Sequence, residues 1–284
     1  MRALTAGAIC AAVAAAAVLC VAFAADGDDE PRRKGEGAEM DETSIRVLYD
    51  NRADVPRLRY GWGLACLVRK GETSLLFDTG SDGGALLSNM ELLQIDPSEI
   101  DGVVLSHAHW DHVGGLPALL KADSDLDVHM LESFPGKLKR SAERAGARVV
   151  EHGPLLAAGG ALEEMRIAPG LYTTGELAGS ISEQALVIET DEGPVMVTGC
   201  SHPGIGEMVE KVSEVFGALR LVLGGFHLFR DGPAEIRRVI EVFQRAGVER
   251  AAPIHCTGKR GIGMFAEVYG ERFVEVGTGT LIEL

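Results

Sequence analysis

From residue 44 to its end, the chain alternates short apolar runs with turn-forming residues. The runs SIRVLYD, GLACLVRK and TSLLFDTG are interrupted by Gly, Asn and Asp, a pattern typical of strands joined by turns. We expect further strands in the runs DGVVLSH, QALVIET, PVMVTGC, LRLVLGG and AAPIHC. Elsewhere apolar positions recur every three or four residues, and this spacing predicts helices at 83–93, 116–122, 135–146, 206–217 and 233–246.

Strands and helices alternate through residues 44–284 without an internal linker or a repeat of solenoid length. The pattern therefore predicts one α/β domain of about 240 residues. Several predicted strands end directly in a polar or sulfur-containing side chain: Asp78, His107, Cys200, His227 and His255. Because loops at one edge of a layered α/β fold converge on one crevice, these strand ends are candidates for a single functional site.

The first 25 residues have a different composition. An apolar run at residues 3–25 follows Arg2 and contains the small-residue pattern AFA at 22–24, as in a secretory signal with its cleavage site. The same run is long enough to span a bilayer, so residues 1–25 are predicted to be a signal peptide or an N-terminal anchor. Cleavage is favoured because much of the run is alanine, which is only weakly hydrophobic. We expect an exported protein, periplasmic or secreted, or one anchored to a membrane.

Residues 26–43 are charged, contain glycine and have almost no large apolar side chains. Such a composition cannot bury enough surface to order itself, which predicts a flexible linker ahead of the domain at 44–284. The whole chain has 42 acidic and 27 basic residues and a formal net charge of −15. This charge disfavours a nucleic-acid partner. We expect a small-molecule substrate, and membrane contact only if the N-terminal segment stays uncleaved.

Cysteine usage gives no sign of a disulfide framework. Cleavage of the N-terminal segment would leave three of the five cysteines, namely Cys66, Cys200 and Cys256. Three cysteines in a domain of this size can form at most one pair and leave one thiol over. Cys200 and Cys256 each lie within two residues of a histidine.

The segment SHAHWDHVGG at residues 106–115 contains three of the eight histidines of the chain. Side chains alternate in an extended segment, so His107 and His109 can reach one metal ion. Asp111 and His112 then fall where a helix begins, offset enough to serve a second ion. Three imidazoles and a carboxylate so close together are unfavourable without a cation, and the two glycines that follow allow a tight bend beside them. The spacing H-x-H-x-D-H therefore predicts a metal site rather than a surface turn.

This motif at the end of a strand resembles the signature of the metallo-β-lactamase superfamily, and the resemblance covers roughly residues 44–284. The segments VLSHAHWDHVGGL, TGCSHPGI, LGGFHL, HCTG and VGTG are similar to the branch that includes the 7,8-dihydropterin-6-methyl-4-(β-D-ribofuranosyl)aminobenzene-5′-phosphate synthases. The resemblance implies a four-layer αββα sandwich. It also implies one or two metal ions, and we expect two divalent ions here, zinc first, with iron or manganese as alternatives.

Carried over to this sequence, the family pattern implies that His107 and His109 hold one ion. Asp111 and His112 would hold the other, with His255 completing that second site. Asp111 is also expected to act in catalysis.

The middle of the chain departs from the family pattern. Many members carry a histidine in a P-G-H-T turn, but this sequence has APGLYTTGEL there, so we expect His202 to supply the missing imidazole. Cys200 stands near the position of a bridging aspartate in the family, and is expected to be either a bridging thiolate or a small buried residue. Asp78 matches a family position too, and is expected to accept a hydrogen bond from a ligand imidazole or to cap a turn.

Other residues have expected roles outside the ligand set. His227 follows two glycines at a strand end and is expected to act in catalysis through the substrate, or to be a satisfied core histidine. Lys259 and Arg260 follow the HCTG segment, where on a loop they would bind a phosphate or carboxylate or would only be solvated. Three further residues have no expected role in the chemistry. Trp110 is expected to fill space beside the helix, with lining of the pocket mouth as the alternative, and His129 and His152 are expected to lie on the surface.

The predicted chemistry is hydrolysis of an ester, lactone, amide or phosphoester by a metal-activated hydroxide. The branch resemblance implies an alternative, transferase chemistry on a pterin, against which an export signal argues because such substrates are cytosolic. A third interpretation is a non-catalytic metal-binding protein. Retention of all four ligand residues in the first motif weighs against it.

Overall fold

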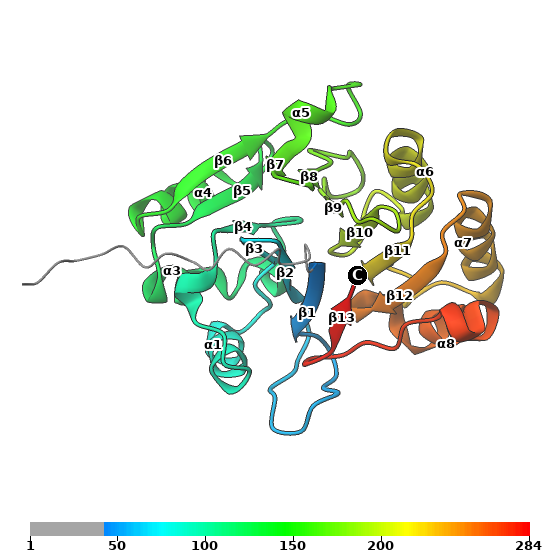
Figure 1. Cartoon of the computed structure of the whole chain (residues 1–284), viewed down its shortest axis with the longest axis horizontal. Helices are drawn as coiled ribbons and strands as arrows, with labels where there is room; N and C mark the ends of the chain where they lie inside the picture. Colours follow the sequence, from blue (N-terminus) through cyan, green and yellow to red (C-terminus); the bar gives the residue numbers. More distant parts are fainter. Residues whose placement is uncertain (1–42) are drawn as a thin grey trace, which may run out of the picture. The chain divides into compact units, whose positions relative to one another are not determined.

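The computed structural model describes residues 43–284, in which two β-sheets lie between two groups of helices (Figure 1). The seven-stranded sheet has the order β13-β1-β2-β3-β4-β5-β6. Its strands are β1 (Thr43–Tyr49), β2 (Ala65–Lys70), β3 (Thr73–Phe77), β4 (Gly102–Val104), β5 (Asp127–Leu131), β6 (Arg148–His152) and β13 (Leu281–Glu283).

The six-stranded sheet has the order β12-β11-β10-β9-β8-β7, and its strands β10, β11 and β12 run parallel to one another. Its strands are β7 (Arg166–Ala168), β8 (Leu171–Thr173), β9 (Leu186–Ile188), β10 (Val195–Thr198), β11 (Leu221–Gly225) and β12 (Arg250–Ile254).

Helices cover the outer face of each sheet (Figure 1). On the seven-stranded side lie α1 (Gly83–Leu92), α2 (Trp110–Val113), α3 (Leu116–Ala122) and α4 (Gly136–Arg144). On the six-stranded side lie α5 (Leu162–Met165), α6 (Ile205–Phe216), α7 (Pro233–Arg245) and α8 (Gly258–Tyr269). Short 3₁₀ turns occupy Pro97–Glu99, His255–Thr257 and Gly270–Arg272.

The alternation of side chains along each strand produces the layers. In β3, Leu75 and Phe77 pack into the core between the sheets, whereas Leu76 packs against the helices. In β10, Val195 and Val197 face the other sheet, whereas Met196 faces α6 and its neighbours. Because both faces of these strands are apolar, each sheet is buried on both sides. The expected four-layer αββα sandwich is confirmed.

The five predicted helices are present, and one helix that the sequence analysis missed is α8. Its sequence GKRGIGMFAEVY contains three glycines. Each glycine inside a helix destabilises it by roughly 1 kcal/mol relative to alanine. Packing of Phe265 and Tyr269 into the core beside the six-stranded sheet stabilises it in spite of that cost. The expectation of a loop after HCTG is therefore wrong.

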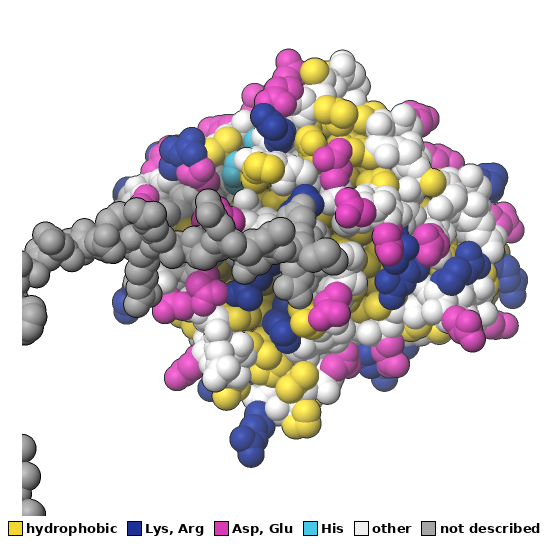
Figure 2. Space-filling model, in the orientation of Figure 1, with side chains coloured by type: hydrophobic (Ala, Val, Ile, Leu, Met, Phe, Trp, Pro, Cys, Tyr) yellow, Lys and Arg dark blue, Asp and Glu magenta, His cyan; other side chains and the backbone are white. Residues whose placement is uncertain are grey.

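The expected signal peptide or anchor at 1–25 and the linker up to residue 42 lie outside the described residues. Strand β1 begins at Thr43, one residue before the expected start of the domain. Within residues 43–284, none of the helices combines the length and apolarity that crossing a bilayer requires. Figure 2 shows acidic and basic side chains interspersed over one face of the molecule.

Candidate metal centre

The H-x-H-x-D-H motif lies in the loop that joins β4 to α3. His107 follows the strand and is fully buried, and His109 is the residue before α2. Asp111 and His112 lie in the first turn of that helix. At Gly115 a Cβ atom would come within 2.1 Å of the main-chain oxygen of Thr79. Only glycine allows the loop to pack this closely, as the sequence pattern indicated.

Four buried side chains form what we call the inner cluster: Asp111, His112, Cys200 and His255. Each offers one ligand atom within 4.8 Å of the others. The Asp111 carboxylate lies 3.4 Å from Nε2 of His255 and 3.7 Å from Nε2 of His112. Cys200 Sγ lies 3.3 Å from the same nitrogen of His112. Residues 88 positions apart in sequence therefore meet at one point.

Each imidazole of the inner cluster is held at its Nδ1 atom by a side chain outside the cluster. His112 donates from Nδ1 to the Asp78 carboxylate at 2.7 Å, and the same carboxylate accepts from the main-chain N–H and the hydroxyl of Ser106. His255 Nδ1 lies 3.0 Å from Oδ1 of Asn51. A proton held on Nδ1 leaves the Nε2 lone pair free to face the cluster. Asp78 thus has the contact with a candidate ligand imidazole that the sequence analysis considered.

A second group, the outer cluster, consists of His107, Cys200 and His202, again with ligand atoms within 4.8 Å of one another. His109 lies beside it, with Nδ1 3.0 Å from Nε2 of His107 and its ring centroid 4.8 Å from that of His202. His109 and His202 are half-buried, unlike the residues of the inner cluster. Cys200 belongs to both clusters and lies between them.

The loop that carries Cys200 and His202 is fixed by Glu183, a residue the sequence analysis missed. One carboxylate oxygen of this fully buried side chain accepts hydrogen bonds from the main-chain N–H groups of Gly199, Cys200 and Ser201. The other oxygen accepts from the N–H of His202 at 3.0 Å. The sequence signal was an acidic residue three positions before the apolar strand β9, since such a residue is rarely buried without partners.

The protonation of these groups differs with their surroundings. Burial, reinforced by the neighbouring histidines, lowers the pKa of His107 well below its usual value and that of His202 to about 4. Burial lowers the pKa of His112 as well, but the carboxylates around it, Asp78 foremost, together outweigh burial and raise that pKa to about 8. Burial raises the pKa of Asp111, but the neighbouring imidazoles of His255 and His112 and a main-chain N–H together outweigh it and bring that pKa to about 2. At neutral pH, His107 and His202 are neutral and Asp111 is ionised, the states that metal ligands require, whereas His112 must release a proton to bind an ion.

Two buried nitrogens show that the arrangement fits cations. Nε2 of His202 and Nε2 of His255 have no hydrogen-bond partner among the described residues. Buried polar atoms normally have a partner, and leaving one unpaired costs about 1–3 kcal/mol. A divalent ion in each cluster would pair both nitrogens. Imidazole, carboxylate and thiolate together suit zinc, and the first two also accept iron or manganese.

The backbone is strained where the candidate ligands are presented. Six non-glycine residues in the described part of the chain have a positive φ, and four of them lie at this centre: Asp78, Ser201, His227 and His255. Such conformations cost of order 1–3 kcal/mol each and persist at functional sites when the surrounding structure imposes them. The strain concentrates at the ends of β3, β10, β11 and β12.

The other candidate residues lie around the centre or away from it. His227 is exposed, with its ring centroid 4.5 Å from that of His202. Lys259 and Arg260 are exposed in the first turn of α8, where Arg260 donates to the main-chain oxygen of Asp231. Whether any of the candidate residues binds an ion or a substrate stays a prediction.

The burial of Trp110, His129 and His152 tests where the sequence analysis placed these side chains. Trp110 is 64% exposed, so it does not fill space beside the helix. His129 is buried in β5 and stacks on the half-buried ring of His152 in β6, with Nδ1 and Nε2 2.8 Å apart, so the surface assignment of His129 is wrong. A histidine can be buried in a strand when a neighbouring strand supplies its hydrogen bond.

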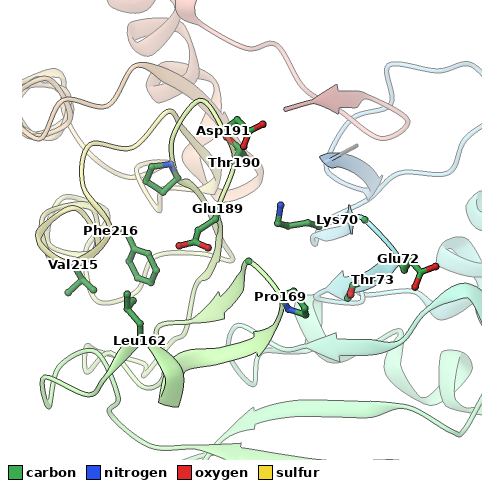
Figure 3. Close-up of a pocket in the computed structure, with 13 residues that line it drawn as sticks. Lys70, Glu72, Thr73, Leu162, Pro169, Glu189, Thr190, Asp191, Val215 and Phe216 are labelled. Carbon is green, nitrogen blue, oxygen red and sulfur yellow. The ribbon is translucent and has the colours of Figure 1, made fainter. Parts of the chain in front are cut away.

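One cavity adjoins the outer cluster, and another lies away from both clusters. A cavity of about 370 Å³ between α6 and α7 is lined by His202 and His227. Its walls combine apolar side chains such as Ile205 and Phe226 with charged ones such as Glu207 and Arg238. A larger one of about 870 Å³, shown in Figure 3, contains no residue of either cluster. It lies beside Lys70 and Thr73 at the turn between β2 and β3, away from the strand ends that carry the histidines.

Comparisons with known proteins agree with this architecture. Residues 63–235 match the family described as the metallo-β-lactamase superfamily. The chain is 31% identical to a 7,8-dihydropterin-6-methyl-4-(β-D-ribofuranosyl)-aminobenzene-5′-phosphate synthase of Methanocaldococcus jannaschii, over 74% of this chain and 84% of that protein.

Two solved structures are similar over most of the chain. One is described as a metal-dependent hydrolase of the β-lactamase superfamily; it is 25% identical, with a TM-score of 0.68 over 85% of this chain and 99% of that one. The other is the metallo-β-lactamase fold protein YhfI from Bacillus subtilis, 17% identical, with a TM-score of 0.63 over 86% of this chain and 100% of that one. The second likeness concerns the fold alone.

Proposed function

Because the chain belongs to the metallo-β-lactamase superfamily, we propose that it is a metal-dependent hydrolase acting on an ester, lactone, amide or phosphoester bond of a small molecule. The observation that carries the proposal is the meeting of the inner and outer clusters at Cys200. Two neighbouring groups of imidazole, carboxylate and sulfur donors are what two divalent cations require.

In this proposal Asp111, His112 and His255 would hold one ion, and His107, His109 and His202 would hold the other. Cys200 belongs to both clusters and would offer its sulfur as a ligand. When bound, such ions supply a water of lowered pKa and polarise a carbonyl or phosphoryl oxygen.

Other side chains of the protein hold the candidate ligands in position. Asp78 and Asn51 orient the imidazoles of the inner cluster through their Nδ1 atoms. Glu183 keeps Cys200 and His202 in position through their main-chain N–H groups. The half-buried outer cluster and the adjoining cavity of about 370 Å³ give a small substrate access.

The experiment begins with the purified full chain, whose metal content is measured by mass spectrometry. Ester, lactone, amide and phosphodiester panels are then assayed beside His107→Ala, with His152→Ala as the matched histidine variant outside the clusters. We expect about two ions per chain, turnover of at least one class, and loss of turnover only in His107→Ala. Equal turnover in His107→Ala and the wild type would remove the clusters from the mechanism.

A second candidate function is that of a transferase, favoured by the 31% identity to a protein named as a synthase. Formation of the product in that protein's name, tested with the same two variants, separates the candidates. Hydrolysis without synthesis supports the hydrolase, and synthesis without hydrolysis supports the transferase. Bound metal without either activity would support a non-catalytic metal-binding protein.

We further propose that the protein acts after export, supported by the composition of residues 1–25. Cell fractionation and mass determination of the mature N-terminus test this. Detection only in the cytosol with residues 1–25 retained would contradict it. An uncleaved chain in the membrane fraction would instead indicate an anchor.

A further inference from the structure

A third group of candidate ligands lies beside the outer cluster and has a different chemistry. We call Cys200, His227 and Cys256 the sulfur cluster; each offers a ligand atom within 4.8 Å of the others. Two sulfurs and one imidazole make a softer donor set than the imidazoles and carboxylate of the inner and outer clusters. Soft thiolate ligands select thiophilic ions such as zinc or monovalent copper.

The backbone is shaped to bring the two cysteines together. Cys200 follows β10 and Cys256 follows β12, with β11 between these two strands in the sheet. At Gly225 of β11 a Cβ atom would come within 2.6 Å of the Cys256 sulfur and 2.5 Å of the main-chain oxygen of Gly199. Strand β11 therefore has no side chain at this position. Cys256 Sγ reaches over it to donate to the main-chain oxygen of Cys200 at 3.6 Å.

His227 completes the group from the end of β11. Its φ of 53° is a conformation that side-chain-bearing residues rarely adopt. The two thiols are buried while His227 is exposed, so the group is open on the imidazole side. An ion can enter from that side without unfolding the loop.

Cys200 and Cys256 are not joined by a disulfide, since the described cysteines carry free thiols. Their sulfur atoms lie within 4.8 Å of each other. A cation bound to each sulfur at about 2.3 Å would span such a gap.

We propose that Cys200, His227 and Cys256 form a separate site for one thiophilic cation, which draws Cys200 away from the inner and outer clusters. The ion is held by two thiolates and one imidazole. His227 is then a ligand, in place of the catalytic role expected from the sequence. Because Cys200 is shared, a soft ion in this site competes with the loading of the other two clusters.

The test uses Cd²⁺ as the thiophilic probe on the full chain after chelation of other metals. The thiolate-to-cadmium charge-transfer absorbance reports how many sulfurs bind the ion, independently of any turnover. We expect two thiolates per Cd²⁺ in the wild type and one in Cys256→Ser. Cys66→Ser, which removes a buried cysteine in β2, is the matched control and is expected to retain two. Equal absorbance in Cys256→Ser and the wild type would overturn the proposal.

A second variant keeps the test valid if Cys256→Ser does not fold. His227→Asn changes an exposed residue to one that tolerates a positive φ, so the fold is expected to be retained. We expect Cd²⁺ affinity to fall by about tenfold or more, with an unchanged urea unfolding midpoint. Unchanged affinity would overturn the role of His227, and a thiol count showing a Cys200–Cys256 disulfide would overturn the site.

Competition with Mn²⁺, which binds thiolates weakly, tests the shared ligand. Protein loaded with Mn²⁺ is titrated with Cd²⁺ while bound Mn²⁺ is followed by electron paramagnetic resonance. We expect Mn²⁺ to be released in the wild type and retained in Cys256→Ser at the same Cd²⁺ concentration. Equal release from both proteins would show that Cd²⁺ displaces Mn²⁺ without this site.

Discussion

The inner and outer clusters share Cys200 but differ in burial and in what holds them. All four residues of the inner cluster are buried, and its imidazoles are fixed by side chains behind them, Asp78 and Asn51. The outer cluster is partly open, and its loop is fixed through the main chain by Glu183. Under the proposed function, this difference would divide the work: the inner cluster would retain its ion, and the outer cluster would exchange water and substrate.

The largest expected effect is in the inner cluster. Asp111→Asn keeps the size of the side chain but removes the charge that faces His112 and His255. We expect turnover to fall by at least about a thousandfold, because several kcal/mol of stabilisation depend on the ion held there. Metal content is expected to fall to about one ion per chain. Asp125→Asn, an exposed aspartate, is the control, and equal metal content in both variants would contradict the division.

The next effect concerns how the outer cluster is held. Glu183→Ala removes the acceptor of four consecutive main-chain N–H groups. Unpaired buried donors cost about 1–3 kcal/mol each, and relaxation of the loop recovers part of that sum. We therefore expect the free energy of unfolding to fall by about 3 kcal/mol, measured by urea titration. Glu267→Ala, on an exposed face of α8, is expected to change it by less than about 0.5 kcal/mol. A similar small change in both would mean that Glu183 does not hold the loop.

A smaller effect compares the supports of the two clusters. Asp78→Asn tolerates the positive φ of this position but weakens the acceptor of His112. We expect metal affinity of the inner cluster to fall about 10–100-fold, as measured by chelator competition. Ser106→Ala removes a hydroxyl that lies 2.9 Å from Nδ1 of His107 and also donates to Asp78, so it is expected to weaken metal binding in both clusters. An affinity loss in Asp78→Asn confined to the outer cluster would contradict the support of the inner cluster by Asp78.

The smallest effect is a pH dependence of the metal-free protein. The folded pKa of His112 is about 8, above the ordinary value of 6.5. Its contribution to stability is therefore fully present below pH 6.5 and is lost as the pH rises through 8. We expect the chelated wild type to lose on the order of 1–2 kcal/mol between pH 6 and 9, and Asp78→Asn to lose less. Parallel pH profiles of the two proteins would show that the Asp78 carboxylate does not set the pKa of His112.

Within each cluster, some residues were easier to predict from the sequence than others. His107, His109, Asp111 and His112 lie within six positions, so alternation along a strand and the start of a helix were enough to place them together. Cys200 and His202 follow β10 and His255 follows β12, and the family resemblance was needed to connect them with the motif. Spacing along the chain cannot show which strand ends meet.

Glu183 and Asn51 were missed because their roles appear only after folding. Glu183 acts on main-chain N–H groups 16 to 19 residues away, which leaves no pattern of side-chain types. Asn51 meets His255 across 204 residues. The layered architecture could be predicted from the sequence, because continuous apolar runs in the strands indicate sheets that are buried on both faces. Helix α8 was missed because tertiary packing overrides its low helix propensity.

Diffraction from crystals loaded with Mn²⁺, recorded at the manganese absorption edge, tests the central claim most directly, because anomalous scattering locates each ion independently of any assay. We expect two anomalous peaks, one among Asp111, His112 and His255 and the other among His107, His109 and His202. A single peak, or peaks remote from both clusters, would contradict the account.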